Sequence, residues 1–245
     1  MNSGSTQVDE HAFVDELRER SDQIRAALVA ASKNGSGLRR LVGAQALVAE
    51  LAVLQPRAVS SCRITQPRYF FDPEDPGFPL VRRSRERGVE IELITTRASV
   101  RTHPLLPSLF PRALVGPTFL RSLVVDDRVL VVEGRHNAEG ERTSWVTEMP
   151  ALVAAVVELW GLTVTHCVPI LPDGTPPPLT ERQLEVARLV AVGDSDATIA
   201  HALHLSGRTV EREVAAVLVE LGARNRTEAV LLMRGRGVNG GRPGS

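Results

Sequence analysis

The side chains best suited to chemistry follow Ser206, in a stretch that mixes arginine, hydroxyl and carboxylate groups. Arg208 and Arg212 are four residues apart, so on a helix both project from one face and could reach guanine edges or phosphates. Thr209 could bond a phosphate. Glu211 could accept a hydrogen bond from cytosine N4, although beside a phosphate it would only repel. The spacing therefore predicts a helix face that could read a DNA groove.

The elements that must position this face are four short amphipathic helices within residues 179–233. The expected capping residues are Thr180, Ser195 and Ser206 at N-termini, and Gly193 and Gly222 in left-handed conformation at C-termini. The third helix places its apolar residues at helical spacing on one face: Val210, Val214, Val217, Leu218 and Leu221. Two short helices joined by the brief turn 204–206 form a helix-turn-helix, whose second helix suits the DNA major groove.

This block resembles the four-helix DNA-binding domain of LuxR-type, also called GerE-type, transcription regulators. The matching residues are Leu179-Thr180-x-Arg182, Glu185-Val186, Gly193-x-Ser195, Ile199-Ala200-x-x-Leu203, Leu205-Ser206-x-x-Thr209-Val210, Leu221-Gly222 and Asn225-Arg226-Thr227-x-Ala229. The resemblance implies that the side chain of Val210 contacts a thymine methyl group. The predicted DNA-binding residues are Ser206, Arg208, Thr209, Val210, Glu211, Arg212, Arg224 and Arg226.

Four positions depart from the family pattern. The family usually has Lys, His and a second Lys where this chain has Glu211, Glu213 and Glu220, and Glu where it has Gln183. Residues 179–238 contain eight arginines and eight acidic residues, so the block is formally neutral. Phosphate contacts supply most non-specific DNA affinity, and we therefore expect a single copy to bind weakly.

Two interpretations of the third helix follow. A helical wheel centred on Val214 places Arg212 almost opposite the apolar face, with Thr209, Glu213 and Ala216 also outward. This arrangement favours DNA binding. The alternative is a helical domain that keeps the family's core and binds a protein partner, such as another regulator, instead of DNA.

The 245-residue chain has room for two modest domains. Its net charge is zero, so the protein is less basic than a non-specific nucleic-acid binder. The expected divisions are an N-terminal tail and helix (1–35), an α/β effector or sensor domain (36–169), a proline-rich linker (170–178), the helix-turn-helix domain (179–234) and a flexible tail (235–245). The N-terminus resembles no signal peptide and no apolar run is long enough to span a bilayer, so we expect a cytoplasmic protein without membrane contact.

Residues 9–31 are predicted to form a helix with an apolar stripe of Phe13, Leu17, Ile24 and Leu28. The stripe suits either a seam with a partner helix, hence possible dimerisation, or packing on the helix's own domain. A second helix is expected over 38–54, strands over 58–64, 89–95, 123–125, 129–132 and 162–168, and helices over 80–87 and 149–160. Residues 97–117 are expected to be irregular. The alternation predicts an α/β sheet.

The order of these elements, with Arg87-Gly88-Val89-Glu90-Ile91, the hairpin at 124–131 and the helix ending at Leu159-Trp160, resembles the phospholipase-D-like effector domain of some LuxR-type and TrmB-type regulators. Catalysis by that fold requires a His-x-Lys pair. The chain's single lysine, Lys33, has Ala31 two residues before it and lies outside the domain. The resemblance therefore implies a catalytically inactive copy.

The residues needed for a phospho-acceptor site, a metal site or a catalytic site are missing from the sequence. Asp126 and Asp127 come too late in the chain for a phospho-acceptor receiver domain, and no lysine follows them. His201 and His204 have no third metal ligand, and surface histidines are the better interpretation. We find no catalytic set and expect no cofactor, no metal and no enzyme activity.

The long loop after residue 66 and the irregular stretch after residue 96 are candidates for effector binding. The candidate ligand contacts are Arg68, Tyr69, Phe70, Phe71, Arg97, Arg101 and His103, with ordinary loop packing and solvated charge as the alternative for each. The expected whole is a regulator that binds double-stranded DNA as a homodimer, under the control of a small-molecule or protein effector.

Overall fold

The computed structural model describes residues 3–33 and 37–236 of the chain. The chain divides into two compact units, and each is described by itself. The sheet unit contains Met1–Pro67, Pro76–Thr96 and Leu114–Val168. The helical unit contains Pro169–Ser245 together with two segments from earlier in the chain, Arg68–Asp75 and Arg97–Ala113.

A mixed eight-stranded sheet organises the sheet unit, with the order β1-β7-β6-β5-β2-β3-β4-β8. The strands are β1 (Leu38–Val42), β2 (Ser61–Gln66), β3 (Glu90–Thr95), β4 (Leu114–Val115), β5 (Ser122–Val125), β6 (Val129–Glu133), β7 (Thr143–Thr147) and β8 (Val168–Pro169). Pairs β2–β3 and β3–β4 are parallel, whereas β1–β7, β7–β6, β6–β5 and β5–β2 are antiparallel. The α/β class expected for residues 36–169 is confirmed.

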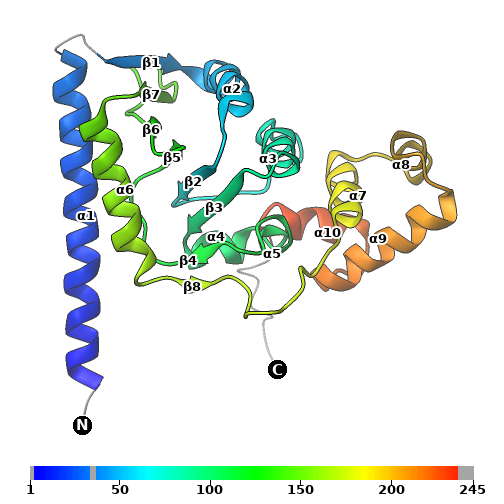
Figure 1. Cartoon of the computed structure of the whole chain (residues 1–245). Helices are drawn as coiled ribbons and strands as arrows, with labels where there is room; N and C mark the ends of the chain where they lie inside the picture. Colours follow the sequence, from blue (N-terminus) through cyan, green and yellow to red (C-terminus); the bar gives the residue numbers. More distant parts are fainter. Residues whose placement is uncertain (1–2, 34–36, 237–245) are drawn as a thin grey trace. The chain divides into compact units, whose positions relative to one another are not determined.

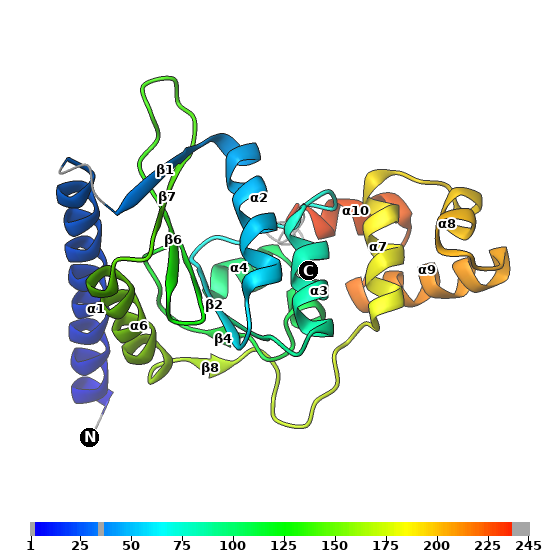
Figure 2. The ribbon, with the colours of Figure 1, turned by 45° about the horizontal axis from the view of Figure 1, so that its top comes forward.

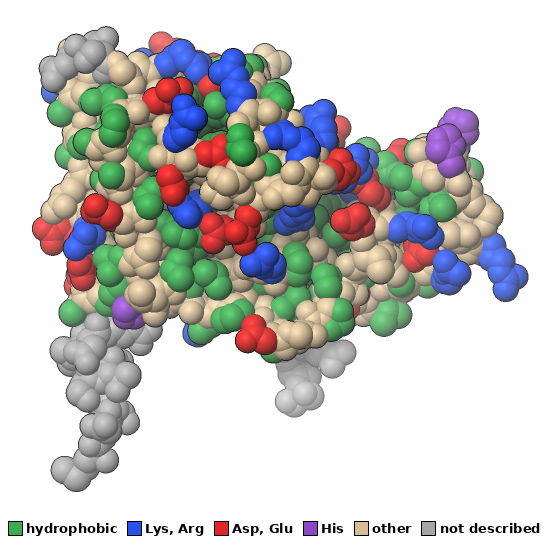
Figure 3. Space-filling model, viewed as in Figure 1, with side chains coloured by type: hydrophobic (Ala, Val, Ile, Leu, Met, Phe, Trp, Pro, Cys, Tyr) green, Lys and Arg blue, Asp and Glu red, His purple; other side chains and the backbone are tan. Residues whose placement is uncertain are grey.

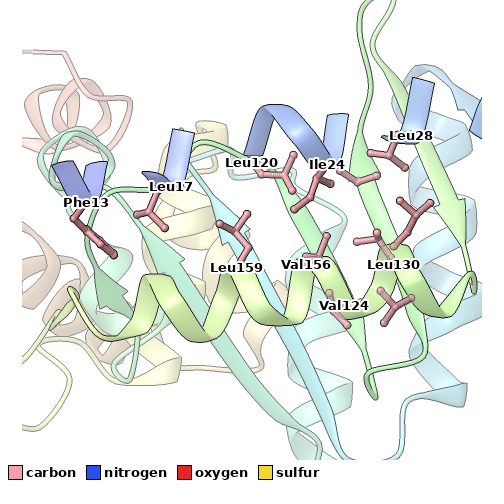
Figure 4. Packing of buried hydrophobic residues seen from close by; sticks show 12 residues of the cluster. Phe13, Leu17, Ile24, Leu28, Leu120, Val124, Leu130, Val156 and Leu159 are labelled. Carbon is pink, nitrogen blue, oxygen red and sulfur yellow. The ribbon is translucent and has the colours of Figure 1, made fainter. Parts of the chain in front are cut away.

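Two helices, α1 (Ser3–Lys33) and α6 (Pro150–Val164), lie side by side on one face of the sheet (Figures 1 and 2). The stripe of Phe13, Leu17, Ile24 and Leu28 points toward α6 and the sheet (Figure 4). These four side chains are at most 8% exposed, so packing on the helix's own domain accounts for the stripe. The alternative prediction, that these residues contact a partner helix, is therefore wrong.

The other face of the sheet carries α2 (Gly43–Leu54) and α3 (Gly77–Glu86), and a short 3-10 turn, η1 (Gln55–Arg57), follows α2 (Figures 1 and 2). Side chains alternate along the strands between the two layers. Val124 and Leu130 pack with α1 and α6, whereas their neighbours Val125 and Val131 belong to clusters on the opposite face.

Three predicted elements are wrong. Residues 38–42 form β1, the partner of β7, and the helix starts only at Gly43, whose φ of +80° interrupts any continuous helix. The strand expected over 162–168 is the end of α6, which continues to Val164. Residues 97–117 contain α4 (Arg97–Thr102), α5 (Leu106–Leu109) and β4.

The helical unit also contains α7 (Glu181–Val192), α8 (Asp196–Leu203), α9 (Gly207–Leu221) and α10 (Arg226–Met233). All three predicted N-caps are confirmed, because Thr180, Ser195 and Ser206 each accept a backbone N–H with their side chains. Gly193 and Gly222 adopt the expected left-handed conformation. Residues 170–178 contain neither helix nor strand. No helix among the described residues has the length and apolar character needed to cross a membrane.

Candidate nucleic-acid interface

The helix-turn-helix consists of α8, the turn 204–206 and α9. His204 ends α8 in left-handed conformation, with a φ of +54°, and Ser206 caps α9 by accepting the N–H of Thr209 at 3.2 Å. Ile199, Val210 and Val217 are at most 1% exposed and fill the space between the helices. This core holds α9 so that one side of it faces outward.

The outward side of α9 is a stripe at helical spacing, which we call the α9 stripe. It consists of Arg208, Glu211, Arg212, Ala215 and Val219, all exposed. Basic side chains gather where α8 and α9 meet (Figure 3). Val219 is 81% exposed, so the stripe includes an apolar side chain. Sequence reasoning missed Ala215 and Val219, although their offsets of seven and eleven from Arg208 indicate the same face.

Two predictions about side-chain direction are wrong. Val210 is completely buried, so its side chain is part of the core and does not present a methyl-binding surface. Glu213 is 7% exposed and does not face outward. A wheel centred on Val214 misplaces Glu213 because two helices, α7 and α8, pack against α9 from different directions. The expectation for Val210 came from the family resemblance, and its burial agrees with its place on the apolar face.

Glu213 is held at the junction of α7 and α9. Its Oε2 accepts a hydrogen bond from Nε2 of Gln183 at 3.1 Å, and its Oε1 accepts one from Nη2 of Arg212 at 2.9 Å. The Arg212 guanidinium, with the Gln183 amide, keeps the pKa of the Glu213 carboxyl below its usual value, although burial opposes this. The carboxylate therefore stays charged and restrains the guanidinium of Arg212, whose side chain is otherwise exposed.

The four predicted arginines differ in their surroundings. Among the described residues, no carboxylate lies within ion-pair distance of Arg208, which is exposed. Arg212 is 71% exposed despite its pairing with Glu213. Arg224 is exposed and paired with Glu228 at 3.0 Å. Arg226 is instead committed to the fold, because its guanidinium pairs with Asp196 and donates to the carbonyl of residue 194.

The two predicted hydroxyl contacts have structural partners. The hydroxyls of Ser206 and Thr209 lie 2.8 Å apart at the first turn of α9. Ser206 is exposed and Thr209 is half-buried, so both remain at the surface beside Arg208. They therefore stay candidates for a phosphate contact at the N-terminus of the helix.

The candidate ligand residues fall into two groups, all within the helical unit. Half-buried Tyr69 packs against buried Phe71 and His103, with ring centroids of the two aromatic residues 5.3 and 5.4 Å from that of His103. The others are exposed: Arg68, Phe70, Arg97 and Arg101. Packing thus accounts for three of the seven.

His103 is completely buried, and neither ring nitrogen has a hydrogen-bond partner in the described part of the chain. Burial lowers the pKa of His103 to about 4, so the ring is neutral at pH 7. Across residues 3–33 and 37–236, no three His, Cys, Asp or Glu side chains gather as a metal site would require. His201 and His204 are exposed on α8 and the turn.

Comparisons with known proteins identify the C-terminal domain. Residues 177–233 match the family described as "Bacterial regulatory proteins, luxR family". The response regulator RamR of Streptomyces coelicolor is 41% identical over 64 residues, which are 26% of this chain and 32% of RamR. The response regulator VraR of Staphylococcus aureus is 42% identical over 53 residues, which are 22% of this chain and 25% of VraR. The chain thus spans a third or less of the length of these relatives.

Similar solved structures cover the first part of the chain. NucT from Helicobacter pylori covers 54% of this chain and 98% of its own, with 11% identity and a TM-score of 0.45. The phospholipase D family member Nuc from Salmonella typhimurium covers 55% of this chain and 99% of its own, with 15% identity and a TM-score of 0.42. These phospholipase-D-like structures are neighbours of the mixed α/β region, and the C-terminal domain is a LuxR-family helix-turn-helix domain.

Proposed function

We propose that this chain is a cytoplasmic DNA-binding transcription regulator in which the α9 stripe enters the major groove. The observation that carries the proposal is the exposure of Arg208 and Arg212 on one side of α9, within a LuxR-family domain. Arginine suits guanine edges and phosphates, and Glu211 between the two suits the N4 donor of cytosine. The two apolar members, Ala215 and Val219, suit thymine methyl groups.

Charge balance makes a second copy important for affinity. The carboxylates of Glu211, Glu213 and Glu220 offset the arginines of α9, so few phosphate contacts are available to a single copy. Two copies on a roughly palindromic site would double these contacts and place two α9 helices in successive major grooves. We therefore propose a homodimer, which native mass spectrometry at micromolar concentration would detect and a monomer there would refute.

The first domain is proposed to control the helix-turn-helix domain and to have no enzyme activity of its own. The chain's single lysine, Lys33, has no histidine two residues before it, so the pair needed by phospholipase-D-type catalysis is missing. Control would come from a small-molecule or protein effector. We keep Arg68, Phe70, Arg97 and Arg101 as exposed candidates for contacts with that effector.

A binding experiment with a pool of random-sequence duplexes tests the function. The full chain should retain a subset of the pool at low salt, and affinity should fall as salt rises. Arg208→Ala and Arg212→Ala should each weaken binding of the enriched duplex by about 1–3 kcal/mol. Arg128→Ala, which removes one exposed arginine from the sheet unit, is the control and should have little effect. No retention of any duplex, even at low ionic strength, would refute the proposal.

A second candidate is an interaction protein that uses the same helix to bind another regulator. The exposure of Val219, which is next to Glu220 in α9, favours this alternative because an exposed apolar side chain among polar neighbours suits a protein surface. If Arg212→Ala and Glu211→Lys both leave DNA retention unchanged, α9 does not face DNA. That result would favour the interaction protein over the DNA-binding regulator.

A further inference from the structure

A series of hydrogen bonds connects the α4–α5 segment (residues 97–113) to the α9 stripe. Ser108, in α5, is buried, and its Oγ accepts the backbone N–H of Leu179 at 3.0 Å. Leu179 is itself 2% exposed and immediately precedes Thr180, the N-cap of α7. The position of the first turn of α7 is therefore set by a side chain of α5.

The first turn of α7 orients the Gln183 side chain. The backbone N–H of Thr180 donates to Oε1 of Gln183 at 2.9 Å, while the Thr180 hydroxyl accepts the N–H of Gln183 at 3.3 Å. Because the amide oxygen is used by Thr180, the amide nitrogen is the end that faces Glu213, 3.1 Å from Oε2. A shift of this turn would therefore move the donor of Glu213.

Glu213 transmits the orientation to the surface. Its side chain is 9% exposed, and its carboxylate has two partners, Gln183 on one oxygen and Arg212 on the other. Arg212 is the exposed partner, with 71% of its side chain accessible. A buried carboxylate whose direction is fixed from α7 thus restrains the guanidinium that faces outward from α9.

We propose that Ser108, Gln183 and Glu213 are positioning residues for Arg212, and that through them the α4–α5 segment adjusts how α9 binds DNA. The proposal rests on the proposed DNA-binding function. Residues 97–113 connect β3 to β4 along the chain, so Ser108 is joined through the backbone to two strands of the sheet unit. This gives the effector domain a covalent route to a DNA-facing arginine that requires no movement of the helix-turn-helix core.

Two buried serines of the same segment make a matched pair for the test. Ser99 and Ser108 are 2% and 8% exposed, and each accepts one backbone N–H at 3.0 Å, from Tyr69 and Leu179 respectively. Only Ser108 lies on the proposed route. We expect Ser108→Ala to weaken binding of the enriched duplex about fivefold, and Ser99→Ala less than about twofold.

A double-variant cycle separates positioning from general loss of stability. In an Arg212→Ala background, Ser108→Ala should cause no further weakening, because the side chain that it positions is gone. Equal weakening by Ser99→Ala and Ser108→Ala, or an undiminished effect of Ser108→Ala in the Arg212→Ala background, would overturn the proposal. Gln183→Met interrupts the same route at a half-buried position, and its effect should likewise disappear without Arg212.

A measurement without DNA tests the route even if the DNA-binding function proves wrong. In the full chain labelled with nitrogen-15 arginine, the Nε–Hε signal of Arg212 is assigned as the one lost in Arg212→Ala. This signal should shift in Ser108→Ala and Gln183→Met and stay in place in Ser99→Ala. An unchanged signal in Ser108→Ala overturns the route, whereas a shifted signal in a chain that retains no duplex sustains the route and refutes only its use on DNA.

Discussion

The side-chain amide of Gln183 donates a hydrogen bond to Oε2 of Glu213 at 3.1 Å, across the junction of α7 and α9. Both residues depart from the LuxR-type pattern, which usually has Glu at the first position and His at the second. The two departures therefore meet in one contact. In this chain the carboxylate of the contact stands on α9, and the amide that donates to it stands on α7.

This relationship predicts compensation between the two positions. Gln183→Glu would place two carboxylates against each other at a buried contact, and we expect it to lower the free energy of unfolding by about 1–3 kcal/mol. Adding Glu213→His should recover most of the loss, because an imidazole donor then replaces the carboxylate that repels Glu at position 183. Urea denaturation of the two variants measures this. A double variant no more stable than Gln183→Glu alone would contradict the compensation.

Charge reversal at Glu211 predicts a gain in DNA affinity. Glu211→Lys replaces a repelling group on the α9 stripe with a cation, so non-specific duplex binding should tighten and the slope of log affinity against log salt should steepen by about 1–2. Glu139→Lys makes the same change in net charge at an exposed position of the sheet unit and serves as the control. Fluorescence anisotropy over a salt series gives both quantities. Equal effects of the two reversals would show that net charge, not the stripe, sets affinity.

His103 predicts acid sensitivity of the helical unit. Its pKa is about 4 in the folded chain against about 6.5 for a free imidazole, so the unfolded chain binds the proton more readily. The stability of the neutral folded form is complete above pH 6.5 and is lost as the pH falls toward 4, by about 3 kcal/mol in total. His103→Leu should abolish this loss.

Tyr69 offers a local probe for that prediction. It is the only tyrosine of the chain, and its ring lies 5.3 Å from that of His103. Fluorine NMR of chain labelled with fluorotyrosine therefore gives one signal beside His103, whose folded and unfolded intensities can be followed in urea at pH 7 and pH 5. The same midpoint at both pH values in the unaltered chain would count against a buried neutral histidine.

Asp126 predicts a second pH dependence, in the sheet unit. Burial alone would raise the pKa of its carboxyl, but N–H groups of Ser61, Ser60 and Val59 donate to it and lower the pKa to about 2. A depressed carboxyl pKa stabilises the fold above about pH 4, and this contribution is lost as the pH falls toward 2. Asp126→Asn should cost about 1–2 kcal/mol at pH 7, because one charged acceptor oxygen is lost.

The neighbouring aspartate supplies the control for Asp126. Asp127 has a nearly identical φ, +51° against +50°, and its carboxylate pairs with Arg63. Asp127→Asn therefore removes an ion pair from the same turn without touching the three N–H donors. Tryptophan fluorescence reports on the sheet unit, because Trp145 and Trp160 both lie in it. A larger loss of stability in Asp127→Asn than in Asp126→Asn would contradict the role given to the N–H groups.

The sequence alone was sufficient for features that depend on a few neighbouring residues. Thr180, Ser195 and Ser206 were predicted as N-caps, and Gly193 and Gly222 as helix ends, because a cap interacts with groups only two to four residues away. The hairpin strands around Asp126 and Asp127 followed from the same kind of local signal. Together with the spacing of apolar residues, these signals determined the helix-turn-helix and the α/β class of the first domain.

Tertiary structure decided what each side chain faces. Glu213 was expected to face outward from α9, and Val210 to contact a thymine methyl group, but helices packed from two sides bury both. The stripe of α1 suited two partners equally, and only the packed domain shows that α6 and the sheet cover it. The partner of Gln183 lies thirty residues along the chain, and that of Leu179 seventy-one residues back. Periodicity shows that one face of a helix or strand is apolar. Which element packs against that face depends on contacts between residues distant in sequence, and no local pattern encodes these contacts.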